Sequence, residues 1–481
     1  MGDYTLRKTG SSKLRDGLDF PVIDTDGHII EALFVIEDFL KEVGGTSLVE
    51  RFNKAFPRGP RSGDAPKTVP WAQFSGKYTI DRATTMLPKL YARRLEEAGC
   101  DFSTLYPTLG FRIQVIPDDE VRAAACRAVN MMYADMFKDV KDKMTPAALI
   151  PMNTPKEAIA ETEFAVKTLG LKALMTCNEV TRTPQIVMEE APQLAGRVRE
   201  YSPLAIDSPY DYDPFWAKCV ELKVCPAGHS MPFIGTHQSP KNYIYNRVGF
   251  WMTYGHAAAR ALFMSGTTQR FPQLNWAFLE GGVWWGVALY NDLVEIWEKR
   301  NMKTMMEYHD QAAIDVALME EMCQRYGDDH LTAERMVSAM QALVKAARTP
   351  DGKVPDFVDD WKDVKLNSRE DIRDSFVNQF YFGCEADDSL NYTAFNTKAN
   401  KLGVKIKAMF SSDLGHWDVL DFGDVLHEAH EAVDRGLMSE DDFKDFVFTN
   451  PLTFQTRVNP DFFKGTAVEG AVASYTKAAA E

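Results

Sequence analysis

The sequence has no uninterrupted apolar run that approaches the roughly 20 residues of a membrane-spanning helix. Residues 1–19 contain no apolar segment of the kind that forms the centre of a secretory signal peptide. We find no repeat of fixed period, which argues against a solenoid or a propeller. From these absences we expect a cytoplasmic protein with no membrane partner and a fold that is not an array of repeats.

The chain also lacks an excess of positive charge and a cysteine framework. Its 69 Asp and Glu residues outnumber 54 Lys and Arg residues, so the formal net charge is -15. A field of this sign repels the phosphates of nucleic acids, and we therefore expect no nucleic-acid partner. The seven cysteines form no Cys-x-x-Cys pair, which indicates reduced thiols.

Eight short apolar runs alternate with amphipathic stretches along the chain. The runs are FPVIDTD, CDFSTLYP, AALIPM, LKALMTC, LKVCPAGHS, NWAFLEGG, FYFGCE and IKAMFSSD. Between them, stretches such as TPKEAIAETEFAVKTLG begin with a Thr and a Pro and end at a glycine, as helices do. Strands that alternate with helices predict a parallel sheet, and eight strands close a barrel. The predicted fold class is α/β, a (β/α)8 TIM barrel.

Two segments depart from this alternation, and we expect each to be an insertion in the barrel. Residues 40–98, after the first strand, contain the Pro- and Gly-rich stretch FPRGPRSGDAPKTVPWAQFSG, which predicts a long loop or lid. Residues 290–376, before the seventh strand, contain helical patterns such as TAERMVSAMQALVKAA. The alternative for this second segment is a separate helical domain. The expected organisation is an N-terminal extension at 1–19, the barrel at 20–465 and a C-terminal tail at 466–481.

Side chains suited to metal binding or acid–base chemistry follow the ends of these strands. In a TIM barrel the carboxyl ends of all strands meet at one rim, where the active site lies. Carboxylates and imidazoles that converge there suit a divalent ion with an open coordination position. The side chains that follow the first, fifth, sixth, seventh and eighth runs are Asp26 and His28, His229, Glu280, Glu385 and Asp413. The sequence therefore predicts a metal site at the rim.

Several of these residues have a plainer interpretation. Asp26 and His28 could be a helix cap and a surface histidine, because Asp-Gly-His is also typical of a turn. His229 has a rival in His237, and we expect His229 to be the ligand because it is closer to its strand. Glu280 could be an acid/base, or it could stay ionised beside a cation and become a ligand.

Three further residues are candidates for substrate contact. Trp251 and Trp284 belong to a set of aromatic side chains that could line a pocket for a flat apolar substrate, although such side chains more often form core. His416 follows Asp413 by three residues, so it could touch the substrate or orient that carboxylate.

These motifs resemble those of the amidohydrolase-related family, in the branch that contains aminocarboxymuconate-semialdehyde decarboxylase. IDTDGH matches the first-strand motif of two ligands separated by one residue, SDLGH the eighth-strand motif, and RFPQLNWAFLEGG the sixth-strand signature. The resemblance runs from about residue 20 to residue 455. Two positions depart from the family pattern. Asp26 stands where relatives have His or Glu, and Glu280 stands where many relatives have an acid/base His.

The resemblance implies one divalent metal ion, with Zn²⁺ preferred and Mn²⁺ as the alternative, held by Asp26, His28, His229 and Asp413. The fourth run ends without the Lys that could bridge a second metal. The implied activity is hydrolysis of a carbonyl-containing small molecule, and the alternative is non-oxidative decarboxylation of an aromatic or unsaturated acid. A third interpretation is an inactive binding protein. The expected site residues are Asp413, Glu280 and His237 in catalysis, and Trp251, Trp284 and His416 at the substrate. A homodimer is expected only on general grounds.

Overall fold

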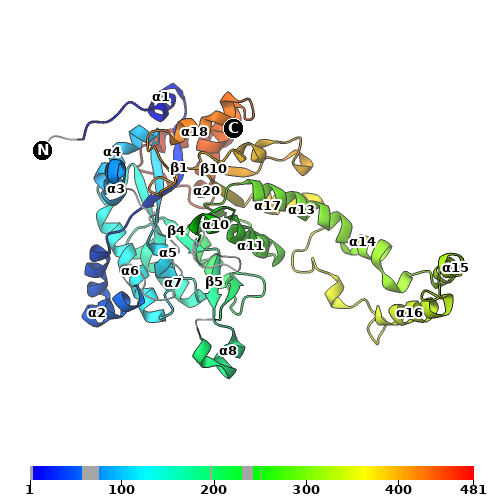
Figure 1. Cartoon of the computed structure of the whole chain (residues 1–481). Coiled ribbons are helices and arrows are strands. Elements are labelled where there is room, and N and C mark those ends of the chain that lie inside the picture. The colour runs from blue at the N-terminus through cyan, green and yellow to red at the C-terminus, as the bar shows by residue number, and fades with distance from the viewer. Residues whose placement is uncertain (1–3, 57–74, 196–197, 230–241, 250, 481) are drawn as a thin grey trace. The chain divides into compact units, whose positions relative to one another are not determined.

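The computed structural model describes residues 4–56, 75–195, 198–229, 242–249 and 251–480, and its centre is a barrel of eight parallel strands (Figure 1). In chain order these strands are β1 (Ile23–Ile29), β2 (Phe102–Pro107), β3 (Met144–Leu149), β4 (Ala173–Cys177), β7 (Pro226–His229), β8 (Trp276–Phe278), β9 (Phe380–Glu385) and β10 (Lys407–Ser411). Each strand pairs in parallel with the next one in this order. All eight predicted strands are present, and the predicted TIM barrel is confirmed.

The barrel closes where the first strand meets the segment that follows the last one. The backbone N–H of His28 donates to the carbonyl of Leu414 at 2.8 Å, and the N–H of Asp413 donates to the carbonyl of Asp26 at 2.9 Å. Residues near the two ends of the chain are therefore brought into direct contact at the rim.

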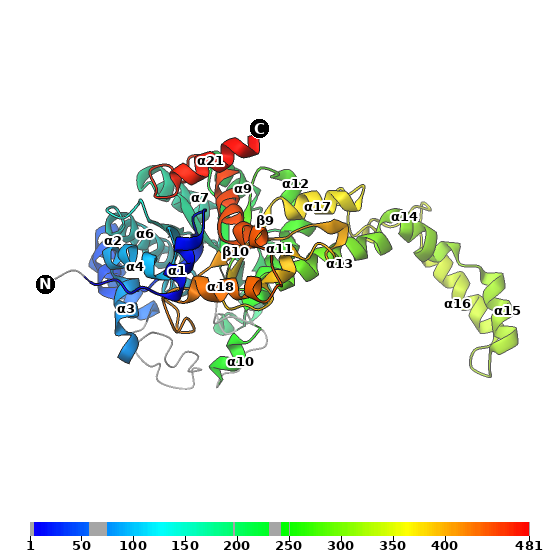
Figure 2. The same ribbon diagram turned by 90° about the horizontal axis from the view of Figure 1, so that it is seen from above.

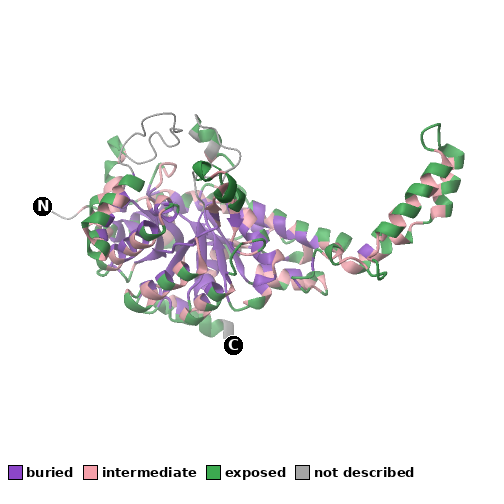
Figure 3. Cartoon of the chain, turned by 90° about the horizontal axis from the view of Figure 1, so that it is seen from below, coloured by how far each residue is buried: buried purple, intermediate pink, exposed green. Residues whose placement is uncertain are grey.

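Helices separate the strands and surround them, so that the buried residues concentrate in the strands and on the inward faces of the helices (Figure 3). Between β1 and β7 the helices are α2 (Leu33–Ala55), α3 (Thr79–Met86), α4 (Pro88–Ala98), α5 (Gly110–Gln114), α6 (Asp119–Met136), α7 (Pro155–Glu163), α8 (Gln185–Glu190) and α9 (Asp213–Leu222). After β7 they are α10 (Tyr243–Arg247), α11 (Trp251–Met264), α12 (Thr267–Arg270), α13 (Trp284–Arg300), α17 (Arg369–Val377), α18 (Val425–Asp434), α19 (Glu440–Lys444), α20 (Asn450–Thr456) and α21 (Glu469–Ala480). No helix of the described ranges has the length and hydropathy to cross a membrane.

Helix α7 shows how the local sequence sets these elements. The Thr154 hydroxyl accepts a hydrogen bond from the N–H of Glu157 at 3.3 Å, and the Glu157 carboxylate accepts one from the N–H of Thr154 at 2.6 Å. This reciprocal cap satisfies two N–H groups that the first helical turn leaves unpaired. Past the helix and the π-helical turn that continues it, Gly170 has a φ of +71°, a backbone conformation that glycine adopts without strain. The helix start and the final glycine agree with the sequence prediction.

The segment predicted as a loop or lid, residues 40–98, is mostly helical where it is described. Helix α2 has non-helical backbone angles at Gly44 and Gly45 but continues to Ala55, and α3 and α4 follow. Pro88 occupies the first turn of α4, where a missing N–H costs nothing. For these parts the loop prediction is wrong, because a proline that begins a helix looks like a loop marker in the sequence. Residues 57–74, with most of the Pro- and Gly-rich stretch, lie outside the described residues.

An antiparallel hairpin that the sequence analysis did not predict follows β4. Its strands are β5 (Glu179–Arg182) and β6 (Glu200–Pro203), with α8 in the connection between them. Neither strand contains a run of apolar residues, since each is only four residues long and at least half of those residues are polar. The hairpin matters because it projects from the carboxyl end of a barrel strand.

The N-terminal extension contains a helix, α1 (Gly10–Gly17), which packs beside α18 (Figure 2). The Ser11 hydroxyl accepts a hydrogen bond from the N–H of Leu426 at 3.0 Å, and the N–H of Ser11 donates to the carbonyl of Gly423 at 3.1 Å. These bonds fix the start of the chain to the segment that follows the last strand.

The chain divides into two compact units, one of residues 1–289 with 373–481 and one of residues 290–372. The second unit contains α14 (Met302–Thr304), α15 (Val316–Tyr326) and α16 (Ala333–Ala346), and the last two are in contact with each other. Asp315 and Thr332 cap these two helices by accepting from the N–H groups of the first turn. The domain boundaries expected from the sequence stay predictions.

Candidate metal centre

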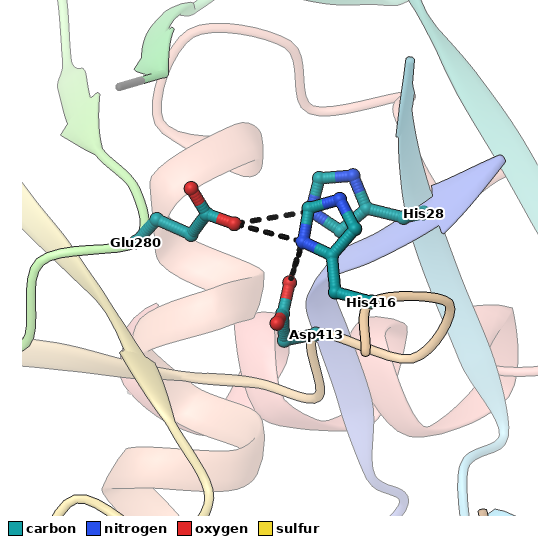
Figure 4. Close-up of side chains that lie close together, drawn as sticks. All are labelled: His28, Glu280, Asp413 and His416. Atoms are coloured by element: carbon teal, nitrogen blue, oxygen red, sulfur yellow. Dashed lines mark ion pairs between the residues drawn. The ribbon is translucent and has the colours of Figure 1, made fainter. Parts of the chain in front are cut away.

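Six polar side chains from the ends of four barrel strands meet at the rim. They are Asp26 and His28 of β1, His229 of β7, Glu280 after β8, and Asp413 and His416 after β10. Five of them are at most 5% exposed, and the side chain of His416 is 15% exposed. Figure 4 shows four of these side chains pointing toward one another.

Asp26, His28 and His229 are spaced like three ligands of one metal ion, and Asp413 belongs to a second, overlapping group with His28, Glu280 and His416. Asp26 Oδ1 lies 3.4 Å from Nε2 of His28 and 3.4 Å from Nε2 of His229. Asp413 Oδ1 lies 3.2 Å from Nε2 of His28. Tetrahedral ligands that are each about 2.0–2.1 Å from an ion are separated by about 3.3–3.4 Å. The spacings of Asp26 with His28 and His229 therefore fit a common cation, and Asp413 adjoins this group at His28.

The same four side chains leave their polar atoms without hydrogen bonds. Judged by direction as well as distance, neither carboxylate oxygen of Asp26 or Asp413 and neither ring nitrogen of His28 or His229 makes a hydrogen bond within the described chain. A buried polar group without a partner costs about 1–3 kcal/mol, and eight such atoms in one cluster need a common explanation. One such explanation is a bound cation that takes oxygen and nitrogen ligands. The residues present therefore fit a divalent metal ion.

His416 lies between two carboxylates beside this group of four. Its Nδ1 is 2.9 Å from Oε1 of Glu280 and 2.7 Å from Oδ1 of Asp413 (Figure 4). Its ring also stacks on the ring of His28, with centroids 3.6 Å apart. Oε2 of Glu280 lies 3.6 Å from Nδ1 of His229. Glu280 thus contacts both a candidate ligand and the neighbouring imidazole.

The carboxylates set the protonation of the imidazoles. Burial by itself lowers the pKa of His416, but Asp413 and Glu280 outweigh burial and raise that pKa well above its usual value. Burial likewise opposes charge on His229, whose pKa is nevertheless raised by Asp26 and Glu280. Protons on these imidazoles and a bound metal ion would therefore compete for stabilisation by the same carboxylates.

Two of the six residues have an unusual backbone conformation. Glu280 has a φ of +53° and Asp413 a φ of +50°, in the left-handed region that costs a non-glycine residue about 1–3 kcal/mol. Each follows directly after a buried strand end, where the chain turns sharply and presents its side chain to the barrel axis. Strain of this kind collects at functional sites, which supports a role for both carboxylates.

Gly27 allows Asp26 and His28 to approach the neighbouring elements closely. The pairing of β1 with β2 shifts register between Asp24 and Gly27, which marks a bulge. A Cβ atom at Gly27 would lie 2.8 Å from a methyl carbon of Leu105 and 2.9 Å from the hydroxyl of Tyr91. Asp-Gly-His is thus part of a bulged strand, and not the surface turn considered as its alternative.

Asp24 supports the bulge from within the barrel wall. Its carboxylate accepts hydrogen bonds from Ser412 N–H and Oγ–H, both at 2.8 Å, and from Ser103 Oγ–H at 2.5 Å. A fourth bond, of 3.2 Å, comes from the N–H of Asp26. Burial raises the pKa of Asp24 to about 6 although these bonds favour the carboxylate. Asp24 therefore joins β1 to the segment after β10 without facing the candidate metal.

Arg247 neutralises the carboxylates on the outer part of the rim. It lies 2.9 Å from Oε1 of Glu385 and 2.9 Å from Oδ2 of Asp418. Glu385, which follows the seventh strand as predicted, is therefore held in an ion pair. Sequence analysis did not single out Asp418, because nothing in the sequence distinguishes it from a surface residue.

A small hollow lies against His229 on the side of the β5–β6 hairpin. Its lining residues are Val115, Asn178, Glu179, Thr181, Tyr201, His229 and Tyr254. Because His229 belongs both to the candidate ligands and to this lining, the hollow adjoins the metal centre. The hairpin residues were not predicted as site residues, because no sequence pattern indicates a hairpin after β4.

Comparison with known proteins agrees with this architecture. The model of the Amidohydrolase family matches residues 23–332. The chain belongs to the amidohydrolase family. No curated protein sequence matches this amidohydrolase.

Solved structures of similar fold cover most of the chain. An amidohydrolase from Mycobacterium avium subsp. paratuberculosis K-10 is 15% identical, with a TM-score of 0.52 over 91% of this chain and 98% of the other. A dihydroxybenzoic acid decarboxylase from Polaromonas sp. JS666, solved with manganese and 2-nitroresorcinol, is 16% identical, with a TM-score of 0.48 over 91% and 97%. A 5-carboxyvanillate decarboxylase from Novosphingobium aromaticivorans, solved with manganese, is 14% identical, with a TM-score of 0.45 over 94% and 100%. At these identities the likeness is one of fold.

The remaining residues expected at the site are placed as follows. His237 and the side chain of Trp251 lie outside the described residues. Of the two histidines expected as alternative ligands, the structure therefore describes the position of His229 alone. Trp284 begins α13, is 38% exposed and does not line the described hollow. The roles expected for these residues stay predictions.

Proposed function

We propose that this amidohydrolase is a metal-dependent decarboxylase of an aromatic or unsaturated carboxylic acid. The observation that carries the proposal is that Nδ1 of His416 lies 2.7 Å from Asp413 Oδ1 and 2.9 Å from Glu280 Oε1. Two carboxylates this close hold a proton on the imidazole. Replacing a carboxyl group by hydrogen requires a proton donor at the carbon, whereas hydrolysis requires a base for water. This arrangement therefore supports the decarboxylase over the hydrolase that we favour from the sequence alone.

The residues that would hold the metal are Asp26, His28, His229 and Asp413. Two carboxylates and two imidazoles suit either Zn²⁺ or Mn²⁺, and metal analysis of the purified protein decides between them. A divalent ion held there would bind and polarise the carboxylate of the substrate.

The protein's own groups would handle the proton. Glu280 and Asp413 lie beside Nδ1 of His416 and stabilise the positively charged ring. His416 would give its other proton, on Nε2, to the carbon that loses CO₂, and the ring is left neutral. His416 is the most exposed member of the cluster, at 15%, so solvent can reprotonate it after each turnover. In this scheme Glu280 is a positioning residue for His416. Asp413 would bind the metal ion and would also position His416.

Hydrolysis is the second candidate, favoured by one feature of the same cluster. Asp413 Oδ1 lies 3.2 Å from His28 Nε2, while both of its oxygens lack a hydrogen bond in the described chain. A carboxylate so placed beside the metal could take the proton of an attacking water molecule. The substrate would then be an ester, amide or lactone.

Product analysis in deuterated solvent separates the two. The protein, loaded with Mn²⁺ or Zn²⁺, is incubated with hydroxybenzoates and aminobenzoates, and with a set of aryl esters, amides and lactones. We expect release of CO₂ with one deuterium at the vacated carbon for each turnover. Turnover of the neutral compounds without CO₂, or CO₂ release without deuterium at the carbon, would show the decarboxylase proposal to be wrong.

A further inference from the structure

We propose that Glu179 and Asn178 form the far end of the substrate site and select substrates that carry a hydroxyl group remote from the reacting carboxylate. A hydroxyl group can donate a hydrogen bond to Glu179 and accept one from Asn178 at the same time. This inference rests on the proposed function, because it takes the reacting carboxylate to lie at the candidate metal ligands.

Glu179 differs from Asp24 and Glu31, two acidic residues of the barrel wall outside the candidate metal centre. It is half-buried and lines the hollow, and its carboxylate makes no hydrogen bond or ion pair with any described residue. By contrast, Asp24 accepts four hydrogen bonds, and Glu31 accepts one from the N–H of Leu109 and one from the hydroxyl of Tyr133. Burial raises the pKa of Glu179 to about 7, so an uncompensated carboxyl group faces the hollow.

Asn178 supplies an unpaired donor beside it. The residue is 4% exposed, and its Nδ2 has no hydrogen bond partner in the described chain. A Cβ atom added at Gly228 would lie 2.0 Å from Asn178 Oδ1. The glycine of β7 therefore makes room for the amide, which is held against the strand with its nitrogen unsatisfied. A buried donor in this state is costly unless a ligand accepts from it.

Two tyrosines form aromatic walls of the hollow. The rings of Tyr201 and Tyr254 have centroids 6.3 Å apart at an interplanar angle of 46°. Burial raises the pKa of both phenols. Glu179 adds to the increase for Tyr201, and Tyr201 and then Glu179 add to it for Tyr254. Aromatic side chains in this position suit contact with a flat substrate ring.

The charge of the hollow excludes a second acidic group on the substrate. Its described lining contains one carboxyl group and no Lys or Arg. A carboxylate substituent there would face Glu179 without a cationic partner, and a methyl group would leave Asn178 Nδ2 and Glu179 unpaired. A hydroxyl group avoids both penalties.

The geometry also sets where the hydroxyl must stand on the ring. His229 Nε2 lies 3.4 Å from Asp26 Oδ1, and the same imidazole forms the near wall of the hollow. A substrate whose carboxylate lies at the candidate ligands would extend past His229 toward Glu179. The hydroxyl selected there is in the meta or para position, since an ortho hydroxyl would lie beside the carboxylate.

Direct binding tests the inference without requiring turnover. The probes are benzoate, 3- and 4-hydroxybenzoate, and 3- and 4-methylbenzoate, titrated calorimetrically into the protein loaded with Mn²⁺. The variants are Glu179→Leu and Glu179→Gln, with Glu190→Gln on the exposed part of α8 as the matched control. We expect one hydroxybenzoate to bind at least tenfold more tightly than its methyl counterpart to the unmodified protein and to the control.

In Glu179→Leu this preference should fall below threefold, while metal content and the affinity for benzoate stay unchanged. Glu179→Gln, which keeps a hydrogen bond acceptor, should retain part of the preference and guards against a folding defect in the leucine variant. An equal affinity for hydroxy and methyl compounds in the unmodified protein, or a preference that survives in Glu179→Leu, overturns the inference. Failure of all five benzoates to bind overturns it as well.

The outcome separates this inference from the proposed activity. A preference that depends on Glu179, without CO₂ release from the bound acids, contradicts the decarboxylase proposal and leaves the recognition by Glu179 standing. CO₂ release from substituted benzoates whose binding is insensitive to Glu179→Leu supports the activity and contradicts the recognition.

Discussion

The imidazole rings of His28 and His416 are stacked, with centroids 3.6 Å apart and an angle of 24° between their planes. One ring points its Nε2 at the two aspartates that would hold a metal. The other points its Nδ1 at Asp413 and at Glu280. The proposed proton donor and the candidate metal ligand are thus neighbours in van der Waals contact, and substitutions can separate the roles proposed for them.

His28→Gln should lose the bound metal, whereas His416→Gln should keep it and lose turnover. Removal of a general acid costs about 10²–10⁴ in rate, so kcat of His416→Gln should fall by that factor. Metal content by elemental analysis and kcat are measured on the same samples. The control is His427→Gln, because the side chain of His427 is 52% exposed on α18. Loss of metal from His416→Gln would make His416 a ligand and contradict its assignment as the proton donor.

Metal affinity should increase with pH. Burial lowers the pKa of His229, but Asp26 and Glu280 outweigh it and raise the pKa above its usual value. Below that raised pKa a proton occupies the ring and opposes metal binding, and above it the competition ends. The apparent Kd for Mn²⁺ should therefore fall as the pH rises from 6 to 8, with protons released on binding. Calorimetric titrations in two buffers of different ionisation enthalpy measure both quantities, and a Kd that does not change with pH would contradict the prediction.

Gly27→Ala should destabilise the protein and weaken metal binding together. The added methyl group would lie 2.8 Å from Leu105 and 3.0 Å from Asp24 Oδ2, inside a wall that cannot relax without moving Asp26 or His28. Overpacking of this kind costs about 1–3 kcal/mol. Urea unfolding gives the change in the free energy of unfolding, and a metal titration gives the change in Kd. Gly17→Ala is the control, because nothing lies within 4 Å of a Cβ atom there.

Lys407 should make the stability of the barrel increase with pH above neutrality. Burial, and to a smaller extent Arg457, lowers the pKa of Lys407 to about 7. Between pH 7 and the ordinary lysine range, the unfolded chain binds a proton at this residue that the folded chain does not. The free energy of unfolding therefore rises with pH, by up to about 1.4 kcal/mol per pH unit for one proton.

The difference between the protein and Lys407→Met isolates this contribution. The methionine variant should be more stable at pH 7, and its advantage should shrink as the pH approaches 9. Denaturant unfolding at several pH values measures the difference. An advantage that stays constant over this range would mean that Lys407 is charged in the folded protein.

The strands and the candidate ligands could be predicted from the sequence because both depend on local pattern. In an α/β chain, a short apolar run such as the one before Asp26 is typical of a strand. Polar residues at the carboxyl end of such a strand lie at the rim of the barrel. Capped helices such as α7 were predictable for the same reason. Asp413 was found from its position after the last run and from the family motif.

Other features depend on contacts between distant segments and were not predictable. Glu31 follows His28 by three residues, yet its two oxygens accept hydrogen bonds from Leu109 N–H and the Tyr133 hydroxyl, both at 2.8 Å, which come from distant parts of the sequence. The β5–β6 hairpin forms by pairing between two segments, neither of which has the apolar pattern that predicts a strand. The sequence around Glu179 therefore does not distinguish it from a surface glutamate.

The closure of the barrel has a consequence for how the protein is made. The Thr25 hydroxyl donates to the carbonyl of Phe410 at 2.8 Å, across 385 residues of sequence, and the two aspartates of the candidate metal centre lie at the same seam. The residues on the β1 side of this seam are synthesised 385 residues before those on the β10 side. Until the segment after β10 has been synthesised, Asp26 and His28 have no Asp413 opposite them, so the β1 side alone cannot form the candidate metal centre.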